Sequence, residues 1–575
     1  MQLFLCLSIA LVQLGIASAS TRVSDAKHHV TYNGLERNGI EVFLGIPYGQ
    51  DTGNINRFKP PKRRVPARGS TIDATAYGPS CPQRLGEWVQ PFSLGNITEI
   101  SEDCLNLNVA RPRGTRAKDR LPVLVYIHGG SFWAGNNHDP TILPDGMILE
   151  SVRNGLPIVH VAINYRLGFF GFAQSGSLKA EGSENAGLRD QRLAIEWVRD
   201  NIEHFGGDPD KITIFGQSSG GLAVGMQIMA YGASKPVPFH QAICQSQALE
   251  PGITGNFTID AMHALVASVG CDATPFHSEE TIACLRKRDM ETLLNASLVT
   301  YQSDISHNIG DIWLPVVDGD FLPAAPSTLI RQGRFANITT MIGWCQDDVT
   351  FFTDPAIKTP EDTYNFVSSY VPGLTKANLD KLLSLYPVSD FLMDATATLS
   401  SEFFRSARIF RDILMTCQPI WYGQHIAKAG NNVYLYDWNQ TILEPIIEKD
   451  TNLTGWGPIH TSEFAYIFGN LSHYNISGNP FHPTPFDYGL AARGSRSWST
   501  FATIGRPSLD GHDTFKVFKP AFANEHDVYI FVVGGPSEGL SAIDGRYSGD
   551  AVRAQKLRER CAFINSPEII EQLRY

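Results

Sequence analysis

Ser218 lies at the centre of the pattern GQSSG (residues 216–220), directly after the apolar run KITIF and before GLAVGMQIMA, which is compatible with a helix. A strand that turns sharply into a helix strains the backbone at the turn, and glycines two positions to either side leave room for neighbouring chain. The serine would then project at a helix N-terminus, where free N–H groups and the helix dipole stabilise negative charge. The spacing therefore predicts Ser218 as a nucleophile.

A second pattern of the same kind, GPSEG, surrounds Ser537 and also follows an apolar run. In sheets that carry such an elbow, the acid and then the base follow the serine along the chain. No histidine occurs after His526, so Ser537 would have no base downstream. Pro536 and Glu538 fit a turn, and we expect Ser537 to lie in a loop.

The residues His128-Gly129-Gly130 follow another apolar run, PVLVYI. Two adjacent glycines let backbone N–H groups approach a substrate oxygen with no side chain in the way, as an oxyanion hole requires. An ordinary Gly-Gly turn is the alternative for these residues taken alone. Together with the elbow, they predict that the N–H groups of Gly129, Gly130 and Ser219 bind an oxyanion.

Short runs that are apolar on both faces read as buried strands, because parallel strands are covered on both sides. Such runs occupy residues 122–127, 157–163, 211–215 and 527–533. Helical patterns lie between them, most clearly over residues 185–205. The alternation predicts an α/β fold with a large, mostly parallel sheet between helices, and a site beyond the carboxyl ends of its strands.

Several motifs in order resemble the type-B carboxylesterases, the family that includes cholinesterases and the larger fungal lipases. The motifs are SEDCLNLN from Ser101, HGGSFWAG from His128, NYRLGFFGF from Asn164, NAGLRDQRLAIEWV from Asn185 and FGGDPDKITIFGQSSGG from Phe205. The resemblance covers most of the mature chain. It implies an α/β-hydrolase fold and a serine esterase that needs no metal or organic cofactor.

The resemblance also points to an acid and a base. The segment CQDDVTFF places Asp348 at the position of the acid, where the family more often has Glu, and the neighbouring Asp347 is the alternative. The segment GPIHTSE makes His460 the base. By the same resemblance, Ser246 and Glu463 are either partners of this triad or ordinary hydrogen-bonding groups of the core.

Other matches and departures bear on structure and specificity. Gln217 stands where the family usually has Glu, which removes a buried charge near the histidine. Trp88 lies early in the first expected disulfide loop, whereas cholinesterases carry their ammonium-binding aromatic residue late in that loop, so no choline-ester preference is expected. The resemblance also implies two structural ion pairs, Arg57 with Glu102 and Arg166 with Asp190.

Residues 1–19 combine an apolar core with small residues at the end, which predicts a secretory signal peptide although no Lys or Arg precedes the core. A buried apolar helix is the alternative. Eight Asn-x-Ser/Thr sequons accompany this segment and predict a glycoprotein. They lie at Asn96, Asn256, Asn295, Asn337, Asn439, Asn452, Asn470 and Asn475.

Eight of the nine cysteines lie beyond the signal segment. Their spacing indicates local bridges from Cys81 to Cys104 and from Cys271 to Cys284, although sequence alone leaves the connectivity open. The resemblance adds a third bridge. It pairs Cys417 with Cys561 and leaves Cys244 and Cys345 as free thiols.

The composition excludes several classes of protein. The chain has 575 residues, 43% of them hydrophobic, and a formal net charge of -11, so it can bury a large core and lacks the basic surface of a nucleic-acid-binding protein. No later run is long enough to span a membrane, and no C-terminal anchor signal follows. We expect a secreted protein with one domain over residues 20–575.

The expected reaction is hydrolysis of a small-molecule or lipid carboxylic ester through an acyl-enzyme on Ser218. Two narrower alternatives are a lipase that acts at oil interfaces and an esterase dedicated to one secondary metabolite. The family also includes adhesion proteins that have lost the serine or the histidine. The presence of the complete set of catalytic residues argues against that role. Neither the oligomeric state nor the natural substrate follows from the sequence.

Overall fold

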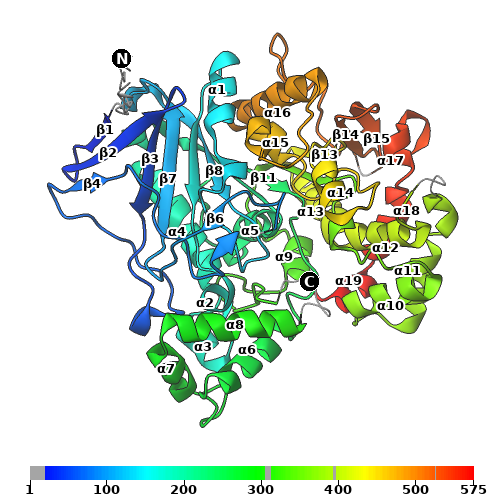
Figure 1. Cartoon of the computed structure of the whole chain (residues 1–575), viewed down its shortest axis with the longest axis horizontal. Coiled ribbons are helices and arrows are strands. Elements are labelled where there is room, and N and C mark those ends of the chain that lie inside the picture. Colours follow the sequence, from blue (N-terminus) through cyan, green and yellow to red (C-terminus); the bar gives the residue numbers. More distant parts are fainter. Residues whose placement is uncertain (1–19, 88, 305–311, 393–396, 525) are drawn as a thin grey trace, which may run out of the picture.

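The computed structural model describes residues 20–87, 89–304, 312–392, 397–524 and 526–575. The predicted signal segment and Trp88 lie outside the described residues. A 13-stranded sheet runs through the molecule from the N-terminal strands to the C-terminal hairpin, with helices on both of its faces (Figure 1). Among the described helices, none is both long and apolar enough to cross a membrane.

The main sheet has the order β1-β2-β3-β7-β9-β8-β10-β11-β12-β13-β14-β15, with β4 beside β2, while β5 and β6 form a separate pair. Neighbouring strands from β9 to β14 are parallel. The strands beyond them along this order pair antiparallel, and β4 pairs parallel with β2. The strands are β1 (Ser20–Asp25), β2 (Val30–Arg37), β3 (Ile40–Pro47), β4 (Thr71–Asp73), β5 (Gly86–Glu87), β6 (Asn96–Ile97), β7 (Asn106–Pro112), β8 (Leu121–Ile127), β9 (Val159–Ile163), β10 (Gly207–Gln217), β11 (Gln241–Gln245), β12 (Thr339–Cys345), β13 (Val433–Trp438), β14 (Tyr529–Val533) and β15 (Gly539–Ala542).

The α-helices are α1 (Asp145–Arg153), α2 (Gly168–Phe172), α3 (Gly176–Glu181), α4 (Ala186–Asn201), α5 (Ser219–Ile228), α6 (Phe257–Ser268), α7 (Glu279–Lys287), α8 (Met290–Asp304), α9 (Pro326–Arg331), α10 (Pro360–Tyr370), α11 (Lys376–Ser384), α12 (Ser401–Arg411), α13 (Cys417–Lys428), α14 (Glu444–Thr451), α15 (Phe464–Ile467), α16 (Pro485–Ile504), α17 (Asp550–Arg553), α18 (Leu557–Ile564) and α19 (Pro567–Leu573). The four strands and the long helix predicted from the sequence are therefore present. The predicted helix over 185–205 ends as a 3-10 turn after α4.

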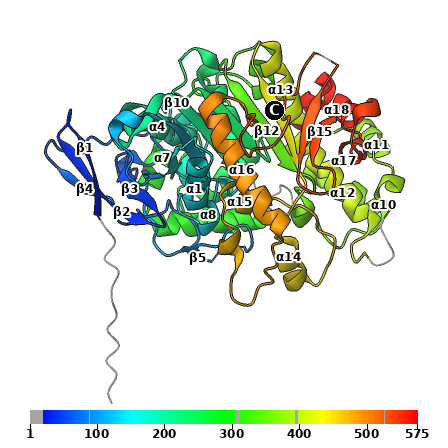
Figure 2. The same ribbon diagram turned by 90° about the horizontal axis from the view of Figure 1, so that it is seen from above.

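Side chains of β8 alternate between the two faces of the sheet. Val123 and Val125 join a hydrophobic cluster with α4 and α5, whereas Leu124 and Tyr126 join a second cluster with α15 and α16. Because both faces are covered, every residue of the run PVLVYI is buried, which explains why the run lacks polar alternation. Figure 2 shows α16, in orange, lying across the face of the sheet that it covers.

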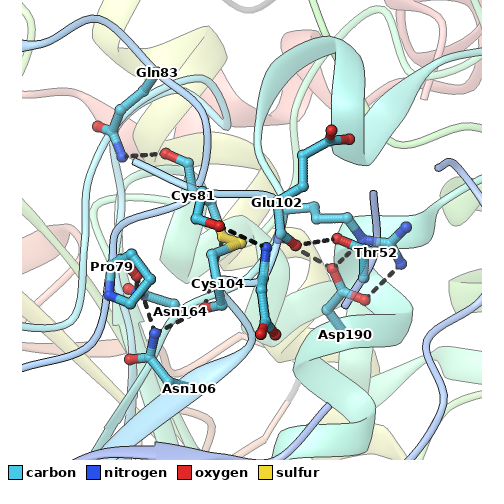
Figure 3. Close-up of a disulfide and its surroundings, with 12 residues drawn as sticks. Thr52, Pro79, Cys81, Gln83, Glu102, Cys104, Asn106, Asn164 and Asp190 are labelled. Atoms are coloured by element: carbon cyan, nitrogen blue, oxygen red, sulfur yellow. Dashed lines mark hydrogen bonds and ion pairs between the residues drawn. A yellow bond between two sulfur atoms is a disulfide. The ribbon is translucent and has the colours of Figure 1, made fainter. Parts of the chain in front are cut away.

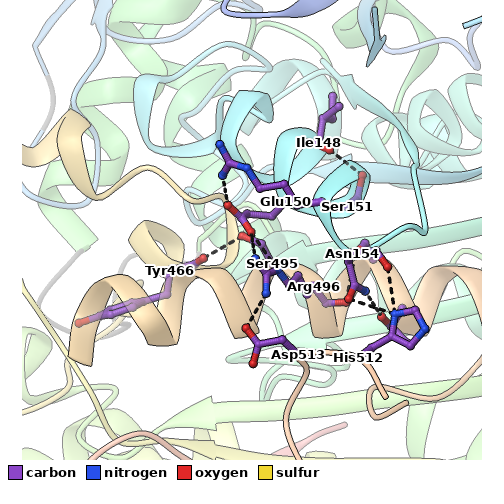
Figure 4. Close-up of polar contacts among 12 residues, drawn as sticks. Ile148, Glu150, Ser151, Asn154, Tyr466, Ser495, Arg496, His512 and Asp513 are labelled. Atoms are coloured by element: carbon purple, nitrogen blue, oxygen red, sulfur yellow. Dashed lines mark hydrogen bonds and ion pairs between the residues drawn. The ribbon is translucent and has the colours of Figure 1, made fainter. Parts of the chain in front are cut away.

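Polar contacts fasten α16 to α1 and α15, and join the segment after α16 to the end of α1 (Figure 4). Arg496 donates to Glu150 at 2.9 Å, and the Ser495 hydroxyl donates to the carbonyl of Ile467 at 2.7 Å. His512 lies 2.9 Å from the carbonyl oxygen of Asn154 through Nδ1. These contacts hold the helix that covers one face of the sheet.

The three expected disulfides are present, Cys81–Cys104, Cys271–Cys284 and Cys417–Cys561, and Cys244 and Cys345 are buried free thiols. Figure 3 shows the first bridge with its surroundings.

Both expected ion pairs are also confirmed. Arg57 lies 2.6 Å from Glu102, and Arg166 lies 2.7 Å from Asp190. Both pairs are largely buried structural contacts: the first joins two segments that precede β7, and the second joins the segment after β9 to α4.

The second G-x-S-x-G pattern forms a turn, as predicted. Ser537 lies between β14 and β15, which pair antiparallel, so no helix follows this serine as it follows a nucleophile elbow. The sequon residues are mostly exposed, whereas Asn470 is buried. Asn470 is 2% exposed, and its side-chain amide donates to three backbone carbonyls, so the glycan predicted at this sequon competes with contacts of the fold.

Candidate active site

Ser218 occupies the turn between β10 and α5. Its backbone has φ 59° and ψ -134°, a combination that is strained for a residue with a side chain. A Cβ added to Gly220 would lie 2.2 Å from the carbonyl oxygen of Ile127, so only glycine lets the helix start this close to β8. The predicted elbow is present, and its serine is half-buried at a helix N-terminus.

The glycine pair after β8 lies against this elbow. A Cβ on Gly129 would lie 2.5 Å from the carbonyl oxygen of Gln217 and 3.0 Å from the Cβ of Ser218. The backbone N–H of Phe132 donates to the Ser219 hydroxyl at 3.1 Å and fastens the loop to the start of α5. The structure thus brings the segment with Gly129 and Gly130 to the nucleophile.

Asp348 and His460 form a buried pair. The Oδ1 atom of Asp348 lies 2.5 Å from Nδ1 of His460, and the backbone N–H of His460 donates to the Asp348 carbonyl at 3.1 Å. Asp347, the alternative acid, points elsewhere and lies 3.6 Å from Arg408. The geometry therefore favours Asp348 as the carboxylate that orients the histidine.

Gln217 connects the two halves of the site. It precedes Ser218 in the chain, and its Nε2 atom lies 3.2 Å from Nε2 of His460. The Ser218 hydroxyl itself makes no hydrogen bond to His460 within the described chain. Catalytic hydrogen bonds are often long before substrate binds and shorten in the complex, so this spacing is compatible with a nucleophile and its base.

A second carboxylate, Glu463, lies behind the pair. Its Oε2 accepts from the Cys345 thiol at 3.1 Å, and its Oε1 accepts from the Gln245 amide at 3.4 Å. Burial and the nearby negative charge of Asp348 raise the pKa of Glu463 to about 7. Burial, followed by the charges of Glu463 and Asp348, raises the pKa of the Cys345 thiol well above its ordinary value. Ser246 donates its backbone N–H to the carbonyl of Gly343 at 2.7 Å, a contact of the core.

Aromatic rings surround the outer side of His460. The ring of Phe352 lies 5.4 Å from that of His460, and the ring of Phe92 lies 6.3 Å from it. Phe92 also contacts Phe351 at 4.6 Å. Phe92 belongs to the Cys81–Cys104 loop, so this loop reaches the catalytic histidine candidate. No sequence signal identifies Phe92, because only the folded loop brings it there.

The base of this loop is joined to the oxyanion segment. Gln83 donates to the carbonyl of Gly135 at 2.8 Å and accepts from the Gly135 N–H at 2.9 Å. Asp139 accepts from the N–H groups of Gly95 and Leu94 at 3.0 and 3.3 Å. The loop is thus held to the segment after β8 at two places.

Comparison with known proteins agrees with these observations. The model of the carboxylesterase family matches residues 28–532. The chain is 54% identical over 572 residues to a secreted lipase of Arthroderma benhamiae, covering 100% of this chain and 99% of the relative. It is 35% identical over 565 residues to an inactive carboxylesterase-like protein of Byssochlamys spectabilis, covering 94% and 93%.

Among solved structures, EstA of Aspergillus niger superposes with a TM-score of 0.75 at 24% identity, over 97% of this chain and 99% of that chain. This likeness and the mostly parallel sheet confirm the predicted α/β-hydrolase fold. The chain therefore belongs to the carboxylesterase family of carboxylic ester hydrolases, as its motifs indicate.

Proposed function

We propose that the chain hydrolyses carboxylic esters through an acyl-enzyme on Ser218, with His460 as the base and Asp348 as the acid. The contact of 2.5 Å between Asp348 and His460 carries this proposal, because it is buried and lies beside the elbow that presents Ser218. A carboxylate on Nδ1 holds the imidazole in the tautomer whose Nε2 accepts a proton.

The reaction follows from these positions. Ser218 attacks the ester carbonyl while its proton passes to Nε2 of His460, and the oxyanion binds the N–H groups of Gly129, Gly130 and Ser219. His460 then protonates the leaving alcohol. Water, activated by the same histidine, releases the acid and restores the serine. Each oxyanion donor typically contributes about 3 kcal/mol in the transition state.

The surroundings favour an apolar ester. Phe92 and Phe352 lie beside His460, and Phe352 is 40% exposed, so an apolar acyl or alcohol group can contact both rings. The Cys81–Cys104 loop also exposes Leu85 and Val89 by 53% and 47%.

Apolar side chains exposed on the loop that reaches His460 favour a lipase as the second candidate, as does the name of the 54% identical relative. Rates on soluble p-nitrophenyl esters and on emulsified triacylglycerol separate the two functions. A steep rise only above substrate solubility identifies a lipase, and saturation below it identifies an esterase.

An organophosphonate probe tests the nucleophile. We expect one adduct, on Ser218, and loss of both labelling and ester hydrolysis in Ser218→Ala. Ser537→Ala serves as the matched control, since it removes the serine of the second G-x-S-x-G pattern. Labelling of another residue, or unchanged hydrolysis by Ser218→Ala, contradicts the proposal. No labelling of the folded wild type would instead favour a non-catalytic protein, as its inactive relative is described to be.

We further propose that residues 20–575 form one domain and that the chain is secreted. One sheet carries the oxyanion segment, the elbow and the acid, so the site draws on most of the chain. Three disulfides are typical of proteins that fold in oxidising compartments.

A further inference from the structure

Gln217 lies over the imidazole ring of His460. Its Nε2 atom is 3.2 Å from Nε2 and 3.4 Å from Nδ1 of that ring. An atom almost equally distant from both ring nitrogens at this range cannot lie in the ring plane, where it would collide with Cε1, the carbon between them. The amide of Gln217 therefore stands over one face of the imidazole, and the side chain is buried at 2% exposure.

This position leaves the in-plane atoms of His460 free for catalysis. Nδ1 faces Asp348 at 2.5 Å and directs its proton to the carboxylate. The lone pair of Nε2 lies in the ring plane, away from the amide above the face. Gln217 thus contacts the base without occupying the direction from which the Ser218 proton arrives.

The contact between the Gln217 amide and the imidazole face is also electrostatically favourable. The face of an aromatic ring is its negative side, and an N–H group over it interacts weakly but favourably. The charged groups near His460 in the described chain are Asp348 in the ring plane and Glu463 on the same segment, while Phe92 and Phe352 are apolar.

We propose that Gln217 is a positioning residue for His460 and determines substrate charge preference. It holds the imidazole by its face and puts an uncharged amide at the position next to Ser218, so the site suits uncharged esters and this residue offers no attraction to a cationic alcohol group. This inference rests on the proposed function, because it takes Ser218 as the nucleophile and His460 as its base.

Gln217→Glu tests the inference, since it adds one charge at constant shape. Acetylcholine and 3,3-dimethylbutyl acetate form a matched substrate pair, alike in shape and different in charge. We expect the kcat/KM ratio of the cationic to the neutral ester to rise at least about fivefold. In Gln217→Glu, the acid limb of the pH profile of kcat/KM should move to higher pH by about one unit, because a carboxylate beside the ring favours the imidazolium.

Exposed Gln50→Glu adds the same charge on the surface and should change neither quantity. Because the ratio is taken within one variant, it does not depend on the fraction of folded enzyme. An active Gln217→Glu with unchanged ratio and acid limb overturns the inference. A folded variant that is inactive at every pH also overturns it, since activity must return above the shifted limb.

If Gln217→Glu does not fold, Gln217→Met tests the positioning role of Gln217 instead. It keeps the approximate volume and removes the amide. We expect kcat to fall several-fold with unchanged KM and an unchanged charge ratio, whereas wild-type kcat would overturn the positioning role. Failure of the proposed function is distinct, because it appears as hydrolysis that persists in Ser218→Ala whatever residue stands at position 217.

Discussion

The backbone N–H of Cys345 donates a hydrogen bond of 2.8 Å to Oδ2 of Asp348, while Oδ1 of the same carboxylate faces His460. The end of β12 therefore fixes the carboxylate from behind. With both oxygens engaged and the side chain fully buried, Asp348 has one orientation toward the histidine. This arrangement suits a group that must hold an imidazole in one tautomer.

Asp348→Asn is expected to lower kcat by about 10⁴-fold, because an amide at this position allows the wrong tautomer of His460. Asp347→Asn is the matched control, since this neighbour faces Arg408 instead. Its activity per active site, counted by phosphonate titration, should stay within a few-fold of wild type. Equal losses in the two variants would contradict the assignment of the acid.

Gly129→Ala tests the oxyanion segment. The added Cβ would lie 2.5 Å from the carbonyl oxygen of Gln217, so the loop must shift. Its N–H groups would then no longer point at the oxyanion. We expect kcat to fall by about 10² to 10³-fold, the cost of losing an oxyanion donor, with little change in KM. Gly489→Ala, where no atom lies within 4 Å of the added carbon, should keep full activity. Full activity of Gly129→Ala would remove Gly129 from the site.

The parts of this site that the sequence predicts are those set by local rules. Ser218 and Gly129 each follow a buried strand. Gly129 and Gly220 lie so close to neighbouring backbone that only glycine fits, so short motifs are enough to identify the nucleophile and the oxyanion segment. The choice of Asp348 over Asp347 required the family resemblance, and the contacts with His460 and Arg408 agree with that choice.

The remaining features depend on contacts between distant segments. Phe92 reaches His460 only because its disulfide loop folds back over the site, and neither residue type nor spacing signals that contact. The Cys345 thiol meets Glu463 across 118 positions of sequence. The sequon at Asn470 is a local pattern as well, but it carries no information about burial, so the sequence does not reveal that this asparagine lies inside the fold.

Glu463 should make the stability of the protein depend on pH. Its pKa is about 7 in the folded state against 4.5 as the ordinary value, so between these two pH values the folded protein holds a proton that the unfolded chain releases. This group therefore stabilises the fold less and less as the pH rises from 4.5 to 7, and its effect is constant above that range.

Glu463→Gln removes this dependence. In denaturant titrations, the free energy of unfolding of the variant minus that of wild type should be larger at pH 8 than at pH 5 by roughly 2 kcal/mol. The exposed Glu559→Gln should give the same difference at both values. A difference for Glu463→Gln that does not change with pH would mean that the carboxyl is ionised throughout, and would contradict the predicted shift.

Glycan mapping tests the fold around Asn470. Its amide nitrogen donates to the carbonyls of Pro140, Thr141 and Leu143, at 2.8 Å for the last, and joins the segment after α15 to the segment before α1. Enzymatic deglycosylation in heavy-oxygen water should label exposed sequons such as Asn475 and leave Asn470 unlabelled. Asn470→Gln should lower the free energy of unfolding by about 1 to 3 kcal/mol, because the hydrogen bonds from the buried amide to these carbonyls are lost. Asn475→Gln changes only an exposed side chain, so a loss of similar size there, or heavy oxygen at Asn470, would contradict the buried anchoring role.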